Sequence, residues 1–148
     1  MTEFVKLDTK NFEQIKELFY AVFTKEPWND DWSDEEQLRL YIGDMIGNKN
    51  SLTYGLMEEG KLVGVSMGEI RHWYSGTEYY INELCILTSV QKKGYGTMFV
   101  NKIMEHAKAM GIDHIFLQTE RHVPAFEFYK KQGFILLEDH VSFIKELR

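Results

Sequence analysis

The sequence predicts an α/β fold: a single domain over residues 1–148, with a mixed central β-sheet flanked by about four helices. Short apolar runs typical of strands alternate with longer segments whose apolar residues recur at helical spacing. One helical segment, after the glycine-rich stretch and up to about Met110, lies between two strand-like runs. Strand–helix–strand units favour a right-handed parallel crossover. The order of elements is therefore β-α-α-β-β-β-α-β-α-β-β.

The first half of the chain begins with a short strand over residues 3–7 and a helix that stops before Pro27. A second helix begins near Ser33, where Ser33 as N-cap and Glu36 three residues later form a capping-box pattern. Strands at residues 52–57 and 62–73 follow, joined by a tight turn at residues 58–61. The apolar face of the second helix consists of Leu38, Tyr41, Ile42, Met45 and Ile46.

The second half continues with a strand over residues 79–87, preceded by a turn at Ser75 and Gly76. After the next helix, Gly111 occupies the position just beyond the helix end that favours glycine. A strand at residues 114–119, a helix from about Val123 and two terminal strands complete the chain. We expect strands 79–87 and 114–119 to be parallel neighbours.

Composition limits the function further. The chain is 44% hydrophobic, too apolar for a disordered protein, and no apolar run reaches the roughly eighteen residues of a membrane span. The N-terminus lacks a signal-peptide pattern, and a single cysteine fits a reducing compartment, so we expect a cytoplasmic protein without a membrane partner. A net charge of −6 argues against a nucleic-acid partner and suits a small cationic ligand. The aromatic content is compatible with a homodimer.

A glycine-rich turn separates the strand at residues 79–87 from the helix that follows. Such a turn favours phosphate groups, because the first amides of a helix lack intrahelical partners and the helix dipole adds positive potential. A P-loop is excluded because no Gly-Lys-Ser/Thr ending is present, and the third glycine of a dinucleotide fingerprint is replaced by Phe99. We expect a pyrophosphate to bind here. The turn consists of Gln91, Lys92, Lys93, Gly94, Tyr95, Gly96 and Thr97.

The turn fits the pattern Gln/Arg-x-x-Gly-x-Gly/Ala at every fixed position, and residues 125–134 read Ala-Phe-Glu-Phe-Tyr-Lys-Lys-Gln-Gly-Phe. In these two segments the sequence resembles the GNAT superfamily of acyl-CoA-dependent N-acetyltransferases. The resemblance implies acetyl-CoA as acyl donor and no metal. It also implies that the Ile86 N–H stabilises an oxyanion, while His122 stands where the superfamily often has an asparagine. The implied cofactor-binding residues are Cys85, Ile86, Leu87, Gln91, Lys92, Lys93, Gly94, Tyr95, Gly96, Thr97, His122, Ala125 and Phe128.

Glu83 is the candidate general base for such a transfer. A carboxylate inside an apolar strand is unusual, and burial raises its pKa toward neutrality, as deprotonation of an ammonium group requires. The alternative is a solvent-facing or ion-paired Glu83, with Glu78 and Glu69 in reserve. By resemblance Tyr129 is the general acid that protonates the departing thiolate. Cys85, a lone cysteine in an apolar strand, is interpreted as a core residue rather than a nucleophile.

The acceptor is expected to be the primary amine of a small cationic molecule, such as an aminoglycoside or a polyamine. Aromatic and acidic side chains in the connection between the first two helices form an anionic wall in this interpretation. The alternative is structural, since acids favour a helix start and a tryptophan can cap a core. A peptide or protein N-acetyltransferase and a non-catalytic acyl-CoA sensor remain as other functions. The candidate acceptor residues are Trp28, Asp31, Trp32, Tyr74 and Tyr79.

Overall fold

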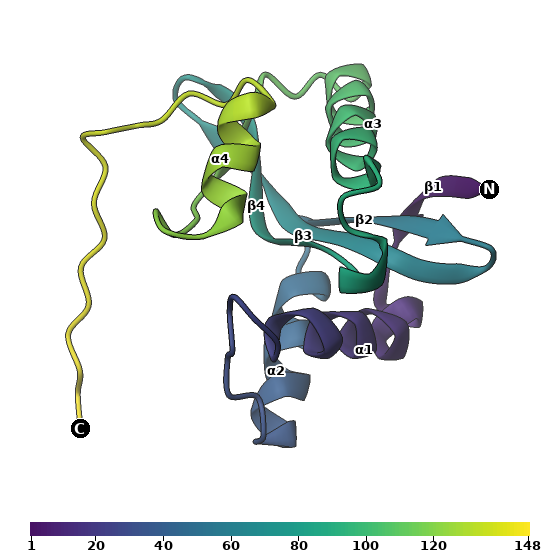
Figure 1. Cartoon of the computed structure of the whole chain (residues 1–148). Helices are drawn as coiled ribbons and strands as arrows, with labels where there is room; N and C mark the ends of the chain where they lie inside the picture. The colour runs from purple at the N-terminus through teal and green to yellow at the C-terminus, as the bar shows by residue number, and fades with distance from the viewer. The chain divides into compact units, whose positions relative to one another are not determined.

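A computed structural model describes residues 1–148 and shows an α/β arrangement with a five-stranded mixed sheet and four α-helices (Figure 1). The strands are β1 (Thr2–Leu7), β2 (Ser51–Glu58), β3 (Lys61–Trp73), β4 (Gly76–Ile86) and β5 (His114–Leu117). The helices are α1 (Phe12–Phe23), α2 (Glu35–Ile46), α3 (Tyr95–Ala109) and α4 (Pro124–Lys131). Strands β1 to β4 pair antiparallel in chain order, and β4 pairs parallel with β5 through the α3 crossover. The predicted fold class and parallel pair are confirmed.

The chain divides into two compact units, residues 1–118 and residues 119–148. The first contains the whole sheet with α1, α2 and α3, and the second contains α4 and the C-terminal segment. None of the helices combines the length and apolar character needed to cross a membrane.

The sheet of the first unit is covered on both faces by helices (Figure 1). Helices α1 and α2 cover one face and bury a core that includes Ile15, Ile42 and Met67, each 0% exposed. Helix α3 covers the other face with Phe99, which packs in a second core around Tyr79, also 0% exposed. Each helix buries one apolar stripe, as its sequence spacing predicts.

An irregularity in the β3–β4 ladder decides which β4 side chains face which core. Met67 pairs with Glu83, but the next residue of β3, Gly68, pairs with Ile81, so Asn82 is an extra residue in β4. This is a β-bulge, in which two residues of one strand oppose one residue of the other. The extra residue shifts the register of β4 by one position. Side chains of β4 before the bulge therefore lie on the opposite face from the one that a regular strand would give them relative to Glu83.

The bulge places Tyr80 and Glu83 on the same face of the sheet although they are three positions apart, a spacing that puts residues of a regular strand on opposite faces. Tyr80 pairs with Glu69, two residues after Met67 in β3, and Met67 belongs to the core under α1 and α2. Ile81 packs in the opposite core under α3. The face under α1 and α2 thus receives the side chains of both Tyr80 and Glu83.

The start of α2 differs from the prediction by one residue. Its N-cap is Asp34, whose carboxylate accepts the Gln37 N–H at 3.1 Å, and not Ser33. The Ser33 N–H instead donates to the Asp31 carboxylate at 3.0 Å. A carboxylate is a strong N-cap because it accepts a hydrogen bond and meets the positive end of the helix dipole. The predicted Ser33–Glu36 capping box is therefore wrong.

The two predicted terminal strands are also wrong, because residues 132–148 contain no strand. The apolar residues in this segment favour an extended conformation, but a strand exists only where its N–H and C=O groups pair with a neighbouring strand. The sheet therefore ends at β5.

Two glycines provide a matched test of the packing around the bulge. A Cβ at Gly68 would lie 2.4 Å from the Tyr80 carbonyl oxygen and 2.5 Å from Tyr79 Cε1, whereas a Cβ at Gly43 would meet nothing closer than 4.0 Å. Gly68→Ala should lower the free energy of unfolding by about 1–3 kcal/mol through overpacking. Gly43→Ala, inside helix α2, should raise it by about 0.5–1 kcal/mol. Urea unfolding of both variants measures the difference, and equal midpoints would contradict the described packing.

Candidate functional site

Glu83 lies on the face of the sheet that α2 covers, where it meets a tyrosine hydroxyl. The Tyr41 hydroxyl of α2 donates a hydrogen bond to Glu83 Oε2. Burial raises the pKa of Glu83, the bond from Tyr41 acts in the opposite direction, and the nearby charge of Asp30 raises it further. The raised pKa that the apolar strand predicts for Glu83 is confirmed in direction. Such a carboxylate is suited to accept a proton.

Tyr41 was predicted as part of the apolar face of the second helix, without a functional role. Its ring indeed packs in that face: it stacks on Trp32 with centroids 5.2 Å apart and lies 5.7 Å from the Phe19 ring. The hydroxyl nevertheless reaches Glu83, and burial is the main cause that raises the pKa of this phenol. The one feature of the sequence that points to such a role is that Tyr41 carries the single hydroxyl on an otherwise aliphatic helix face.

The two tryptophans of the α1–α2 connection contact the core beneath them. Trp28 lies 5.4 Å from the Phe23 ring, and Trp32 makes an edge contact with Phe19 at 5.4 Å. The Trp32 indole N–H is buried and has no hydrogen-bond partner in the chain. Asp31 is exposed, and its bond to Ser33 lowers its pKa. The connection is thus fixed to the core by its rings while its carboxylates face outward.

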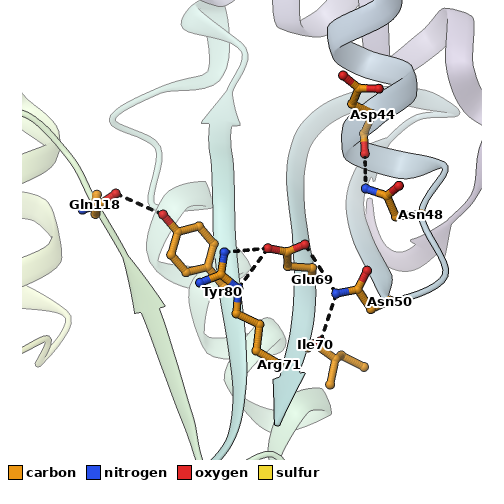
Figure 2. Close-up of polar contacts among 8 residues, drawn as sticks. All are labelled: Asp44, Asn48, Asn50, Glu69, Ile70, Arg71, Tyr80 and Gln118. Atoms are coloured by element: carbon orange, nitrogen blue, oxygen red, sulfur yellow. Dashed lines mark hydrogen bonds and ion pairs between the residues drawn. The ribbon is translucent and has the colours of Figure 1, made fainter. Parts of the chain in front are cut away.

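A polar cluster surrounds Glu69 and Tyr80, which pair across β3 and β4 (Figure 2). Glu69 accepts hydrogen bonds from Arg71 at 2.7 and 3.0 Å and from Asn50 at 3.4 Å. The Arg71 guanidinium lies 3.9 Å from the centroid of the Tyr80 ring, and the Tyr80 hydroxyl donates to Gln118 at 3.0 Å. Both carboxylate oxygens of Glu69 therefore already accept hydrogen bonds from Arg71 or Asn50.

Other acidic and aromatic candidates lie apart from Glu83. Glu78 is 8% exposed, and its carboxylate is bonded to His114 Nε2 at 2.9 Å. Tyr79 is fully buried on the α3 face, where its hydroxyl donates to the Leu52 carbonyl at 2.9 Å. Tyr74 is 90% exposed in the β3–β4 turn. The structure therefore brings Trp32 together with Glu83 through Tyr41, and it does not bring Tyr79 there.

The glycine turn has the backbone expected of an anion site. Gly94 is the N-cap of α3 with φ 82°, a left-handed conformation that favours glycine, and Lys92 has φ 67°. Gln91 Nε2 donates to the Ile86 carbonyl at 2.8 Å, which holds the turn to the end of β4. The first intrahelical bond runs from Met98 N to Gly94 O at 3.1 Å. The amide-rich helix start and the exposed Lys92 and Lys93 can accept an anion.

Other residues of the turn have partners of their own or lie exposed. Tyr95, the first residue of α3, donates its hydroxyl to Glu58 of β2. Gly96 follows in the first turn of α3, and Thr97 is exposed there.

The end of β4 adjoins this turn. The β4–β5 ladder stops at the Ile81–Leu117 pair, so residues 82–86 of β4 continue beyond the partner strand. Cys85 is 6% exposed, and burial raises the pKa of its thiol. The thiol is therefore not suited to act as a nucleophile. Ile86 and Leu87 are half-buried at the strand end.

The second unit contains the remaining predicted residues. Tyr129 lies in α4 between the rings of Phe128 and Phe134, at 5.4 and 5.5 Å. The helix ends in a Schellman motif, since the Phe134 N–H donates to the Tyr129 carbonyl and Gly133 has φ 91°. His122 is exposed before the helix, and Ala125 is half-buried in its first turn.

The sequence of the chain is similar to those of known acetyltransferases. A model of the acetyltransferase (GNAT) family matches residues 12–134. The uncharacterized N-acetyltransferase CgeE of Bacillus subtilis (strain 168) is 29% identical over 77 residues, which are 52% of this chain and 30% of that relative. The chain thus spans less than a third of the length of CgeE.

Solved structures have the same fold. The aminoglycoside acetyltransferase meta-AAC0020 from an uncultured soil metagenomic sample, in complex with sisomicin, has a TM-score of 0.77 and 22% identity, covering 99% of this chain and 97% of that one. AAC(6')-Iy in complex with the bisubstrate analog CoA-S-monomethyl-acetylneamine has a TM-score of 0.77 and 13% identity, covering 99% of both chains. At these identities the similarity establishes the fold.

Glu83 should cost the protein stability at neutral pH. A carboxyl whose pKa is raised in the folded state contributes stability that is fully present below its ordinary pKa and is lost as pH rises through the raised value. Glu83→Gln should therefore raise the free energy of unfolding at pH 7 by on the order of 1 kcal/mol. The gain should disappear in acid. Denaturant unfolding at a series of pH values measures this, and a gain that persists unchanged at acidic pH would contradict the assigned burial of the charge.

Proposed function

The chain belongs to the acetyltransferase (GNAT) family, and on this premise we propose that it transfers the acetyl group of acetyl-CoA to the primary amine of a small cationic molecule. The observation that carries the proposal is Glu83: a buried carboxylate with a raised pKa that the β4 bulge turns toward Tyr41 of α2, whose ring stacks on Trp32 of the α1–α2 connection.

The proposed reaction begins with the removal of a proton. An alkyl ammonium group has a pKa of about 10.4, so nearly all of it is protonated at neutral pH and cannot attack. Glu83 accepts this proton, directly or through a water molecule. The free amine then forms the new C–N bond at the thioester carbonyl carbon, and the C–S bond breaks. By the family motif, Tyr129 donates a proton to the departing thiolate, which leaves as the thiol of CoA. The second proton of the attacking nitrogen is lost through water and restores the Tyr129 hydroxyl, and the proton on Glu83 passes to solvent.

The residues at the end of β4 fit the acyl donor. The α3 N-terminus, with Gly94 and two exposed lysines, suits the pyrophosphate, since fixed amides and positive charge favour it. The strand segment from Cys85 to Leu87 extends beyond the β4–β5 ladder and can pair with an extended amide-containing arm. We assign the same contact role to His122, Ala125 and Phe128 of the second unit by their family motif.

The acceptor proposal rests on the α1–α2 connection. Trp28 and Trp32 present rings there, and Asp30 and Asp31 add negative charge, a combination that favours a cation. Structures of the same fold include an aminoglycoside acetyltransferase in complex with sisomicin, which supports a small polycationic acceptor. Tyr74, exposed in the β3–β4 turn, is assigned to the outer part of the acceptor site.

Release of free CoA from acetyl-CoA tests the activity. The purified protein is incubated with a panel of polyamines, aminoglycosides, amino acids and peptides, and the products are identified by mass. We expect acceptor-dependent release with at least one polyamine or aminoglycoside. The Glu83→Gln variant should lose roughly 10²–10⁴-fold in kcat, the contribution of a general base. Tight acetyl-CoA binding without release for any acceptor would instead indicate an acyl-CoA sensor, and release with peptides alone would indicate a peptide acetyltransferase.

Tyr129 is tested by removing its hydroxyl. Tyr129→Phe keeps the ring contacts with Phe128 and Phe134 and removes the proton donor. We expect kcat to fall by roughly 10²-fold with little change in thermal stability. Full kcat in this variant would remove Tyr129 from the proposed mechanism.

A further inference from the structure

We propose that Tyr41 is a positioning residue for Glu83, and that its hydroxyl holds the carboxylate with Oε1 turned to the acceptor amine. This inference rests on the proposed function, because it assigns a role within the same transfer. Neither the family motifs nor the sequence spacing points to Tyr41, since it lies in α2, outside both segments that carry the GNAT resemblance.

The position of the Tyr41 ring is determined by its neighbours. One face stacks on the Trp32 indole at an interplanar angle of 29°, and the Phe19 ring lies 5.7 Å away. Both neighbours are anchored in the core under α1 and α2. A ring held on two sides directs its hydroxyl in a fixed direction, and that direction is toward Glu83 Oε2.

The hydrogen bond leaves the two carboxylate oxygens with different roles. Oε2 accepts the bond from Tyr41, so Oε1 is the oxygen available for a proton from the acceptor. A carboxylate that is free to rotate would present either oxygen, and the productive orientation would be one of several. Fixing the base in this way corresponds to the orientation effect by which enzymes align reacting groups.

The bond also stabilises the ionised carboxylate in a site that disfavours the charge. Burial and Asp30, from the α1–α2 connection, both work against ionisation of Glu83. On β4 the Tyr80 hydroxyl donates to Gln118, and Cys85 is a buried neutral thiol. On β3 the facing residue is Met67, which does not titrate. Tyr41 therefore supplies the hydrogen bond that stabilises the charged form of the base.

The connection that is proposed to bind the acceptor contacts the same ring. Trp32 lies in that connection, stacks on Tyr41, and has a buried indole N–H without a partner. An acceptor that engages Trp32 thus acts on the residue that orients the base. Tyr41 thus links the proposed acceptor site to the proposed base, because its ring stacks on Trp32 and its hydroxyl donates to Glu83.

The test compares Tyr41→Phe with the natural protein in the pH dependence of kcat/KM. The variant keeps the ring and removes the donor, so the acidic limb of the profile should move to higher pH. At the acidic end kcat/KM should fall by about tenfold, the effect of losing one hydrogen bond to a charged group. The loss should lie in kcat more than in KM and should be smaller at high pH. The acceptor, and with it the pKa of its ammonium group, is the same in both experiments. A shift of the acidic limb therefore reports a change in the pKa of a group of the enzyme.

Two further variants separate positioning from general damage. Tyr20→Phe, on α1 and 45% exposed, removes a tyrosine hydroxyl away from the site and should leave the profile unchanged. In a Glu83→Gln background, Tyr41→Phe should have little further effect on kcat, because the two residues act as one unit. An additive loss in the double variant would overturn the positioning role, and a loss equal at all pH values would overturn the stabilisation of the charged carboxylate by Tyr41.

A second measurement does not depend on turnover. The protein is labelled with ¹³C at the glutamate carboxyl groups, and Glu83, identified by the Gln variant, is titrated by NMR. Tyr41→Phe should raise the pKa of Glu83. An unchanged titration would refute the Tyr41 role even in an active enzyme. A raised pKa in a protein that releases no CoA would leave the Tyr41–Glu83 coupling established and refute the proposed transfer instead.

Discussion

The architecture of the candidate site depends on one extra residue in β4. Strict alternation would send Tyr80 and Glu83 to opposite faces of the sheet, and the bulge at Asn82 brings them to the same one. The opposing residue in β3 is Gly68, which has no side chain to collide with the displaced backbone. The two cores on either side of the sheet therefore keep their apolar character, while the face under α1 and α2 also receives a carboxylate.

Much of this organisation could be predicted from sequence, because it depends on local patterns. The glycine turn with Gly94 and the unusual acid Glu83 stand out in any periodicity analysis. The bulge at Asn82 could not be predicted, since it is a property of two strands in register rather than of one segment. For the same reason residues 132–148 were predicted to form strands that the structure does not contain. Tyr41 was recognised as a packing residue, but its hydrogen bond joins elements far apart in the chain.

The site and the fold make opposing demands on Glu83. Stability favours a neutral group at this depth, whereas proton transfer needs a carboxylate that can ionise near neutral pH. The contacts around it are a compromise: burial raises its pKa and the Tyr41 hydroxyl limits the rise. The same ring carries the stack with Trp32, so packing in the core of α1 and α2 contributes directly to the electrostatics of the site. Tyr41 is thus structural by its burial and, in the proposed transfer, functional by its hydroxyl.

The buried position of Cys85 has a practical consequence for the laboratory. It is the single cysteine of the chain, it is 6% exposed, and burial raises the pKa of its thiol. The thiolate is the form of cysteine that attacks a thiol-reactive dye, so the folded protein should contribute almost no background colour with such a reagent. Any thiol that appears during incubation with a thioester then originates from the small molecule. The same property makes dye labelling of Cys85 a sensitive indicator that the core has opened.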